Sequence, residues 1–273
     1  MRRLRLTAGY TIEEAAEGLP FSEAMLQRAE TGLSSLRQSG HLRSLLERYG
    51  VSDERSIEEL LDIQREASSE EWVSDYKDVM TPPLMSKFVG IEEEARMIRA
   101  FHPLLPWGSL QTESYARAIF AMQQPVLEVT SESVDKAVRL RMRRREFLTR
   151  DEEPVRLHAI IGEPAFRHVI GDIEVLQEQC REIVMLSERE NITIQVLPSS
   201  GHRYRFTGDF SILDMGNVLP SQVQVDNAWG ALSMSGKPRD VGVFSRRFER
   251  LTASALPPEE TPEFIRTLAR EIK

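Results

Sequence analysis

The chain has 273 residues, of which 41% are apolar and 29% charged, a composition typical of a globular protein with one or two domains and a sizeable core. Its single cysteine excludes a framework of intramolecular disulfides and a cysteine-rich zinc site, and its net charge of -8 argues only mildly against a small DNA-binding part carried by an acidic body. Because the N-terminus lacks the apolar run of a signal peptide and no window holds the roughly 18 apolar residues of a membrane span, we expect a cytoplasmic protein.

The first part of the chain has the pattern of successive short helices. Thr11 and Ser22 are good N-caps for the second and third helices, and Gly32 ends the third. Apolar residues recur in helical register through the fourth and fifth. The predicted helices span residues 2–8, 12–19, 22–32, 37–49 and 56–67. We therefore predict an all-α head of five helices over residues 1–67.

Helical periodicity fails in the next segment, which holds paired prolines, acidic residues and scattered aromatic residues. We predict a linker over residues 68–90. Three helices are expected beyond it, over residues 92–101, 111–123 and 131–149. Cys180 falls within a later helical pattern, which favours a buried, inert thiol over a nucleophile.

After Pro154 the pattern changes to that of buried strands alternating with helices. The predicted strands are LHAIIG (157–162), ITIQVLP (192–198), FSILDM (210–215) and QVQVDNAWGALSM (222–234). The predicted helices of this region span residues 163–169, 173–189, 238–256 and 258–272. The strand–helix–strand order predicts an α/β domain over residues 91–273, so the fold class of the whole chain is α+β.

Two of the predicted helices meet the geometric requirement for reading DNA. A short helix must fit the major groove, and a second helix must brace it through a tight turn. TIEEAAEGL (11–19), the connector Pro20–Phe21 and SEAMLQRAETG (22–32) supply a helix, a turn and a helix. The small side chains of Ala15 and Ala16 allow the two helices to approach closely.

These motifs resemble a known family. The pattern S-x-x-x-[IL]-x-R-x-E-x-G, followed by a leucine-bearing helix, is similar to the Cro/C1-type (Xre) helix-turn-helix. The rest of the chain resembles DUF5753, an uncharacterised domain that follows an Xre head in a large family of actinobacterial regulators. The segments that carry this resemblance are residues 88–120, 139–150, 192–198 and 244–272, and GSLQTESYARA (108–118) is the most specific.

The resemblance implies a transcriptional regulator that binds double-stranded DNA, often encoded beside a small partner protein. On the recognition helix Ser22 would be the N-cap, and the residues expected to face base edges are Glu23, Ala24, Gln27 and Arg28. Arg28 suits guanine, Glu23 suits the amino group of cytosine, and Ala24 suits the methyl group of thymine. Phosphate contacts are expected from Thr11, Ser34 and Ser35, with added charge from Arg37 and His41. Met25 stands where the family commonly has lysine.

The charge of the head bears on how it binds. Residues 1–52 contain seven arginines and six glutamates, so a single head attracts DNA weakly. We therefore expect a homodimer that places two heads on half-sites about one helical turn apart. The C-terminal domain would then dimerise or receive a signal.

RLRMRRREFLTR (139–150) contains six arginines. An arginine-rich helix that binds nucleic acid is one interpretation. A solvated or acid-paired helix face is the favoured one, because no aromatic residues are interleaved for base stacking.

Motifs for catalysis and metal binding are missing from the sequence: it has no HExxH, GxSxG, P-loop or GxGxxG, and no pair of histidines stands at metal spacing. We therefore predict no catalytic residues, no metal site and no cofactor. Two strand-end acids, Glu163 and Asp226, are the residues an enzyme would use, together with Arg167. A ligand pocket is a more modest hypothesis, formed by Trp107, Tyr115, His158, Glu163, Asp226 and Trp229. The alternatives to a regulator are an antitoxin-like or sequestering module that acts with a small partner protein, and an enzyme on the α/β domain.

Overall fold

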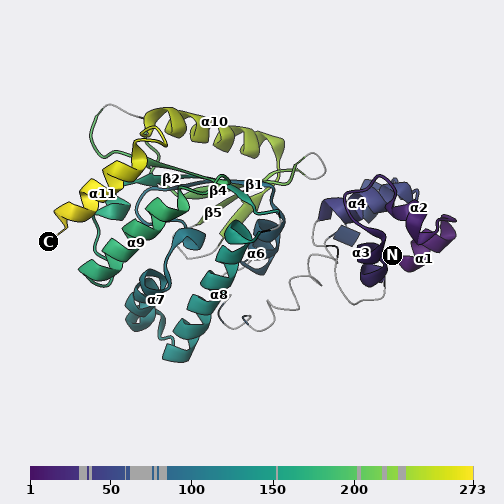
Figure 1. The fold of residues 1–273 in the computed structure, drawn as a ribbon, viewed down its shortest axis with the longest axis horizontal. Helices are drawn as coiled ribbons and strands as arrows, with labels where there is room; N and C mark the ends of the chain where they lie inside the picture. The colour runs from purple at the N-terminus through teal and green to yellow at the C-terminus, as the bar shows by residue number, and fades with distance from the viewer. Residues whose placement is uncertain are drawn as a thin grey trace.

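The computed structural model describes residues 1–30, 36, 39–58, 60–61, 76, 79, 85–151, 153–201, 204–216, 220–226 and 232–272. Within these ranges the chain forms a helical N-terminal head, followed by a C-terminal domain of helices around a mixed six-stranded sheet (Figure 1). The predicted α+β fold class is therefore confirmed.

The head consists of short helices around a small apolar core. Its helices are α1 (Arg2–Thr7), α2 (Ile12–Ala16), α3 (Glu23–Glu30) and α4 (Ser39–Arg48), and residues 54–58 and 60–61 are also helical. α2 contacts α3, and the small residues Ala15 and Ala16 of α2 are buried. Leu26 of α3 and Leu45 of α4 are fully buried and fill the centre of the head.

Side-chain caps fix where α2 and α3 begin, as the sequence predicted. The Thr11 hydroxyl accepts a hydrogen bond from the backbone N–H of Glu14, whose carboxylate accepts from the N–H of Thr11. The Ser22 hydroxyl accepts from the N–H of Met25 at 3.3 Å. α2 ends before the predicted end at Leu19, because Gly18 adopts a left-handed φ of 69° that a helix cannot contain.

Two arginines hold the helices of the head together. Arg5 of α1 makes two 2.8 Å hydrogen bonds to the carboxylate of Glu30 at the end of α3, and it also donates to the carbonyl oxygen of Tyr10. Arg48 of α4 donates to the carbonyl oxygens of Glu14, Ala15 and Glu17, at the C-terminal end of α2. Each carbonyl there lacks a partner within the helix, so Arg48 both satisfies these acceptors and fixes α2 against α4.

The C-terminal domain is built on a sheet with the strand order β3-β2-β1-β4-β5-β6. The strands are β1 (Met97–His102), β2 (Arg156–Gly162), β3 (Ile192–Leu197), β4 (Phe210–Asp214), β5 (Gln222–Asp226) and β6 (Leu232–Ser235). β1, β2 and β3 are parallel, whereas β4, β5 and β6 join as antiparallel neighbours. β1 therefore lies where the parallel half meets the antiparallel half. The carboxyl ends of β1 and β5 and the amino end of β4 consequently meet at one edge of the sheet.

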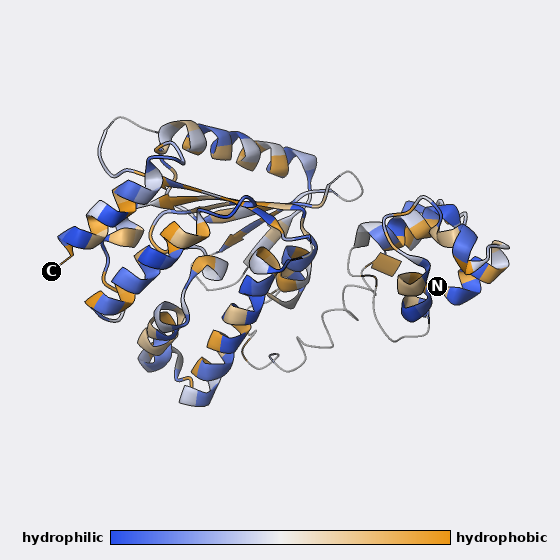
Figure 2. Cartoon of the chain, in the orientation of Figure 1, coloured by the Kyte–Doolittle hydropathy of each residue, from blue (hydrophilic) through white to orange (hydrophobic). Residues whose placement is uncertain are grey.

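Helices cover both faces of this sheet. They are α6 (Met85–Glu94), α7 (Glu113–Leu127), α8 (Ser131–Thr149), α9 (Ile173–Leu186), α10 (Pro238–Ser254) and α11 (Thr261–Glu271), with short 3₁₀ turns at Gly108–Leu110 and Glu163–Phe166. α10 lies on one face, and α8, α9 and α11 lie on the other (Figure 1). The strands between them are largely apolar (Figure 2).

The alternation of side chains along the strands creates two cores. Phe101, Phe210 and Val223 face α10 and pack with its Phe248 and Leu251. The opposite face of the sheet contributes residues to the larger core, which it shares with α9 and α11; these include Ile98, Ala159, Ile194, Leu176 and Ile265. Because neighbouring residues on a strand point to opposite faces, this division also fixes which polar side chains share a face.

One predicted helix is wrong. Residues 92–101 were expected to form a helix, but α6 ends at Glu94 and β1 begins at Met97. β1 is the central strand, with neighbours on both sides and its two faces covered, so its sequence MIRAFH shows no clean alternation of apolar and polar residues. The local pattern alone therefore did not distinguish it from the end of the preceding helix.

Two further predictions need adjustment. The single strand expected over residues 222–234 is two antiparallel strands, β5 and β6, which pair with each other. Most of the predicted linker, 68–90, lies outside the described residues, but residues 85–90 form part of α6. The other strands and the long helices occur near the predicted positions.

The close approach of two strand ends gives a test of this fold. Gly162 ends β2, and a methyl group on it would overlap the backbone carbonyl of Pro103, which follows β1. Gly162→Ala should therefore lower the free energy of unfolding by about 1–3 kcal/mol in urea titrations. Gly242→Ala is the matched control, because Gly242 lies within α10 and a methyl there meets only the far end of Arg246 at 3.5 Å. The control should be neutral or stabilising, and equal losses in the two variants would contradict the packing described here.

Candidate functional site

The first candidate site is the outer face of α3. Glu23, Ala24, Gln27 and Arg28 are all exposed, while Leu26 between them is buried in the head. Their spacing of one, three and four residues places them on one side of the helix. The residues that the sequence assigned to base contacts therefore form a continuous solvent-facing surface, bounded by the exposed cap Ser22. Chemically, the surface offers a guanidinium, an amide, a carboxylate and a methyl group.

The surrounding residues give this surface little additional charge. Thr11 is exposed at the start of α2, but its hydroxyl is occupied by the cap with Glu14. Met25 is half-buried against the core of the head, so its side chain serves packing. Ser34, Ser35 and Arg37, also predicted to bind DNA, lie outside the described residues.

His41 does not add charge, contrary to the prediction. The residue is only 7% exposed, and its ring lies 5.3 Å from that of Phe21. Burial lowers the pKa of His41 below its usual value, so the ring is neutral at pH 7. Its position on the inner face of α4, next to Leu42 and Leu45, is that of a core residue.

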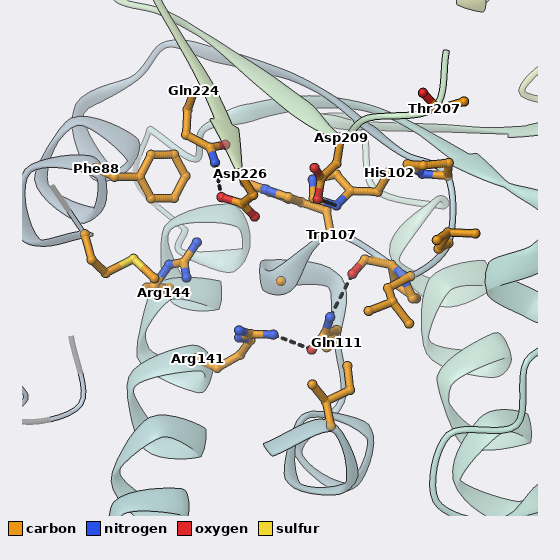
Figure 3. Close-up of a pocket in the computed structure, with 17 residues that line it drawn as sticks. Phe88, His102, Trp107, Gln111, Arg141, Arg144, Thr207, Asp209, Gln224 and Asp226 are labelled. Atoms are coloured by element: carbon orange, nitrogen blue, oxygen red, sulfur yellow. Dashed lines mark hydrogen bonds and ion pairs between the residues drawn. The ribbon is translucent and has the colours of Figure 1, made fainter. Parts of the chain in front are cut away.

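The second candidate site is a cavity of about 430 Å³ in the C-terminal domain (Figure 3). It lies at the edge of the sheet where β1 and β5 end and β4 begins. Its lining comes from α6, the segment after β1, α7, α8 and those three strand ends. The lining residues are Met85, Phe88, His102, Pro103, Leu104, Leu105, Pro106, Trp107, Gly108, Gln111, Ile119, Arg141, Arg144, Thr207, Asp209, Gln224 and Asp226. Open mixed sheets commonly bind ligands at such a switch point between strands.

Strand alternation explains which sheet residues reach this cavity. Val223 and Val225 of β5 pack toward α10, so Gln224 and Asp226 face the opposite side, which α8 covers. Asp209 directly precedes β4, and His102 ends β1. The QVQVD alternation seen in the sequence therefore separates a core face from a polar, cavity-facing one.

The helix side of the cavity carries two arginines. Arg144 forms a bidentate ion pair with Glu92 of α6, with N–O distances of 2.7 and 2.8 Å, and both side chains are buried. Arg141, one turn earlier on α8, donates instead to the amide oxygen of Gln111 at 2.6 Å. Among the described residues no carboxylate lies within ion-pair distance of Arg141. Burial and the neighbouring Arg144 lower the pKa of Arg141 to about 9, which leaves it charged at pH 7.

The sheet side of the cavity carries acids. Partial loss of water around Asp226, together with the nearby carboxylate of Asp209, raises the pKa of Asp226 to about 6. Gln224 donates a hydrogen bond to the same carboxylate. Nδ1 of His102 lies 3.8 Å from Asp209, and burial lowers the pKa of His102 to about 4, so its ring is neutral at pH 7. The cavity thus has an acidic wall opposite a basic one.

The structure brings together only part of the pocket predicted from the sequence. Trp107 and Asp226 both line the cavity. Tyr115 is fully buried in the core, and its hydroxyl has no hydrogen-bond partner among the described residues. His158 faces α10, where it forms a hydrogen bond with Gln195 and contacts the ring of Phe248 edge-on. Its side chain therefore lies on the face of the sheet opposite to the cavity. Trp229 lies outside the described residues.

Glu163 is also separate from the cavity. Its carboxylate accepts hydrogen bonds from the backbone N–H of Ser199 at 2.7 Å and from Arg167 at 2.6 Å, and these interactions lower its pKa against the opposing effect of burial. Glu163 and Asp226 therefore do not form the paired carboxylates that acid–base catalysis would need. The interactions of Glu163 instead tie β2, β3 and the turn after β2 together.

The sequence pattern did not predict that arginines of α8 line the cavity. The arginine-rich helix was expected to present a solvated or acid-paired face; Arg144, Arg143 and Arg145 do pair with glutamates, but Arg144 is buried. A signal was present, however: Arg144 lies four residues from both Leu140 and Leu148, which are buried. An arginine at a core-facing helical position requires a buried partner or a site.

Cys180 is buried as predicted, at 2% exposure, and burial raises the pKa of its thiol to about 11. Within the described part of the chain no group of three or more metal-binding side chains comes together. In the same part of the chain, no helix combines the length and apolar character that crossing a bilayer requires.

Two family models match the chain. Residues 85–267 match a family described as "Domain of unknown function (DUF5753)", and residues 1–59 match a "Helix-turn-helix domain". No curated protein and no solved structure matches the chain.

The buried ion pair predicts a strong effect on stability. Glu92→Leu leaves Arg144 charged and unpaired inside the protein, so the free energy of unfolding should fall by about 3–5 kcal/mol. Glu146→Leu is the control. Glu146 pairs with Arg143 on the exposed face of α8, so its replacement should change stability little. The double variant Glu92→Leu/Arg144→Met should recover most of the loss in urea titrations. A double variant as unstable as the single one would contradict the unpaired-charge explanation.

The raised pKa of Asp226 predicts a pH dependence of stability. A carboxyl that is protonated more readily in the folded than in the unfolded protein stabilises the fold at low pH, and this contribution is lost as pH rises to about 6. Asp226→Asn cannot titrate, so wild type should lose stability relative to this variant between about pH 4 and pH 6. The effect of His102 runs in the opposite direction but is present in both proteins. A stability difference that stays constant with pH, measured by urea titration, would show that the pKa is not raised.

Proposed function

Because the chain belongs to the DUF5753 family and begins with a helix-turn-helix domain, we propose that it is a transcription regulator that reads operator DNA as a dimer. The helix-turn-helix domain makes it a DNA-binding regulator in the broad sense. The finer proposal is that α3 enters the major groove of the DNA and that the C-terminal domain dimerises or receives a signal. We propose that the protein acts in the cytoplasm. We propose no catalytic role for the chain.

The observation that carries this proposal is the surface of α3. Glu23, Ala24, Gln27 and Arg28 project into solvent from a short helix, while Leu26 and Ala29 anchor the other side of that helix in the core. The pair Arg5–Glu30 joins α3 to α1, and the contacts of Arg48 join α2 to α4, so both helices of the motif are fixed within the head. A rigid helix with an exposed polar face is what direct readout of base edges requires.

The charges of the head support the proposal of a dimer. Arg5 pairs with Glu30, Arg43 pairs with Glu47 and Glu54, and Arg48 is bound to backbone carbonyls. These arginines are engaged inside the head, so few cations of one head are available for phosphates. We propose that two heads bind half-sites about one helical turn apart, roughly 34 Å. Analytical ultracentrifugation of the full chain, alone and with DNA, measures the number of copies.

The same shortage of charge favours one alternative, a module that acts through a small partner protein. In that case the chain would co-purify with the product of the neighbouring gene and neither the chain nor the complex would bind upstream DNA. DNA binding by the chain alone would exclude this alternative as the sole function.

The role of Arg28 can be tested directly. Arg28→Ala should weaken binding to DNA from upstream of the chain's own gene by about 1–3 kcal/mol, because a bidentate contact with guanine would be lost. Arg239→Ala is the matched control, since it removes the same charge from an exposed position on α10, outside the head. The measurement is a gel-shift titration repeated over a range of salt concentrations. If Arg28→Ala and Arg239→Ala bind equally well, α3 is not the reading helix, and if wild type shows no shift even at low salt, direct DNA binding is wrong.

A further inference from the structure

The cavity at the edge of the sheet has walls of opposite charge. Asp209 and Asp226 lie on the side of the strands, and Arg141 and Arg144 lie on the side of α8 (Figure 3). Figure 3 shows Arg141 and Asp226 on opposite sides of the open space, with Trp107 next to Asp226. A ligand confined here would meet an acidic group at one end and a basic group at the other.

The two arginines are not equivalent. Arg144 is neutralised by its bidentate pair with Glu92 and lies 5.3 Å from the ring centre of Phe88, so its charge is already compensated. Arg141 donates to a neutral amide oxygen and lies over the face of Phe120, and it forms no ion pair among the described residues. Its guanidinium carries five N–H donors, most of which those contacts leave unused. An anionic group would satisfy Arg141 where the protein does not.

On the opposite wall two carboxylates lie close enough to interact electrostatically. Asp226 accepts one hydrogen bond from Gln224, and His102, which lies nearest to Asp209, is neutral at pH 7. No lysine or arginine side chain of the described residues forms an ion pair with either acid. Arg144 and Arg141 act on Asp226 only from beyond ion-pair distance, and its pKa is still raised. The two acids repel each other, so a positively charged ligand group would be favoured between them.

The remaining lining is apolar. Trp107, Phe88, Leu105 and Ile119 contribute rings and aliphatic surface to the lining. A ligand that is only anionic would face Asp209 and Asp226, and one that is only cationic would face Arg141. Either ligand would therefore bring its charge close to side chains of the same sign in a partly enclosed space, which is unfavourable.

We infer that the cavity binds a small zwitterion of the size of an amino acid or short peptide, whose carboxylate pairs with Arg141, whose ammonium faces Asp209 and Asp226, and whose side chain lies on Trp107. The cavity volume of about 430 Å³ lies within the range of small-molecule sites. This inference rests on the proposed function, because the cavity would be the site at which the C-terminal domain receives its signal. Binding is measured without DNA, so failure to bind the zwitterion and failure to bind DNA are separate results.

The test uses the full-length protein and isothermal titration calorimetry. The probes are the common L-amino acids and their dipeptides with glycine, and each one that binds is compared with its amine, which lacks the carboxylate, and its acid, which lacks the amino group. For tryptophan these partners are tryptamine and indole-3-propionate. Loss of either charged group should weaken binding roughly 10- to 100-fold, as expected for charge-assisted hydrogen bonds.

Variants assign each end of the probe. Arg141→Gln should abolish the preference for the zwitterion over its amine, and Asp226→Asn should reduce the preference over its acid. Arg143→Gln is the control, because Arg143 is on the same helix but pairs with Glu146 at the surface; it should bind as wild type does. Gly108→Leu should block every probe, since a side chain at Gly108 grows toward Arg141, 3.4 Å from its Cβ position. Thermal unfolding of each variant verifies that it is folded.

Three results would overturn the inference. The first is that no zwitterionic probe binds wild type at concentrations up to about 10 mM, a limit that corresponds to negligible affinity. The second is that an amine or an acid binds as tightly as its zwitterion. The third is that folded Arg141→Gln binds the probe with unchanged affinity and unchanged preference.

Discussion

The buried ion pair between Arg144 and Glu92 fixes the geometry on which the C-terminal domain's cavity depends. Two charges are stable inside a protein only when each is fully satisfied, and the bidentate geometry at 2.7 and 2.8 Å achieves this. The pair holds α6 against α8. It thereby positions Phe88 and Met85 of α6 on one side of the cavity and leaves Arg141, one turn away on α8, to face its interior.

The sequence predicted the elements of the C-terminal domain better than their assembly. Strong local patterns, such as ITIQVLP and the amphipathic helix around Cys180, appear where expected. The central strand β1 was mistaken for a helix, because a strand buried on both faces loses the alternation that identifies strands. The cavity could not be assembled without β1. Its carboxyl end supplies His102 and the segment that carries Trp107, and the strand order around it decides that Asp226 belongs to the cavity and His158 to the other face.

In the head, some features follow from the local sequence, and others depend on contacts between helices that are distant in the chain. The caps Thr11 and Ser22 and the exposed positions of α3 follow from short-range patterns, and the sequence was sufficient for them. The buried position of His41 and the engagement of Arg5 and Arg48 depend on contacts between helices distant in the chain, which no local pattern encodes. Counting charges in the sequence therefore overstated how many cations the head presents to solvent.

The strand order has a consequence for how the protein is made. The hydrogen bonds and ion pairs described within the head join residues at most 34 positions apart, the longest being that from Arg48 to Glu14. β1, in contrast, needs β4, which begins at Phe210, and the acidic wall needs β5. Contacts close in sequence form early, and distant pairings form late. On the ribosome, the head would be able to fold while the strands that complete the cavity are still to be synthesised, so the newborn chain would acquire the helices of its head well before the cavity of its C-terminal domain.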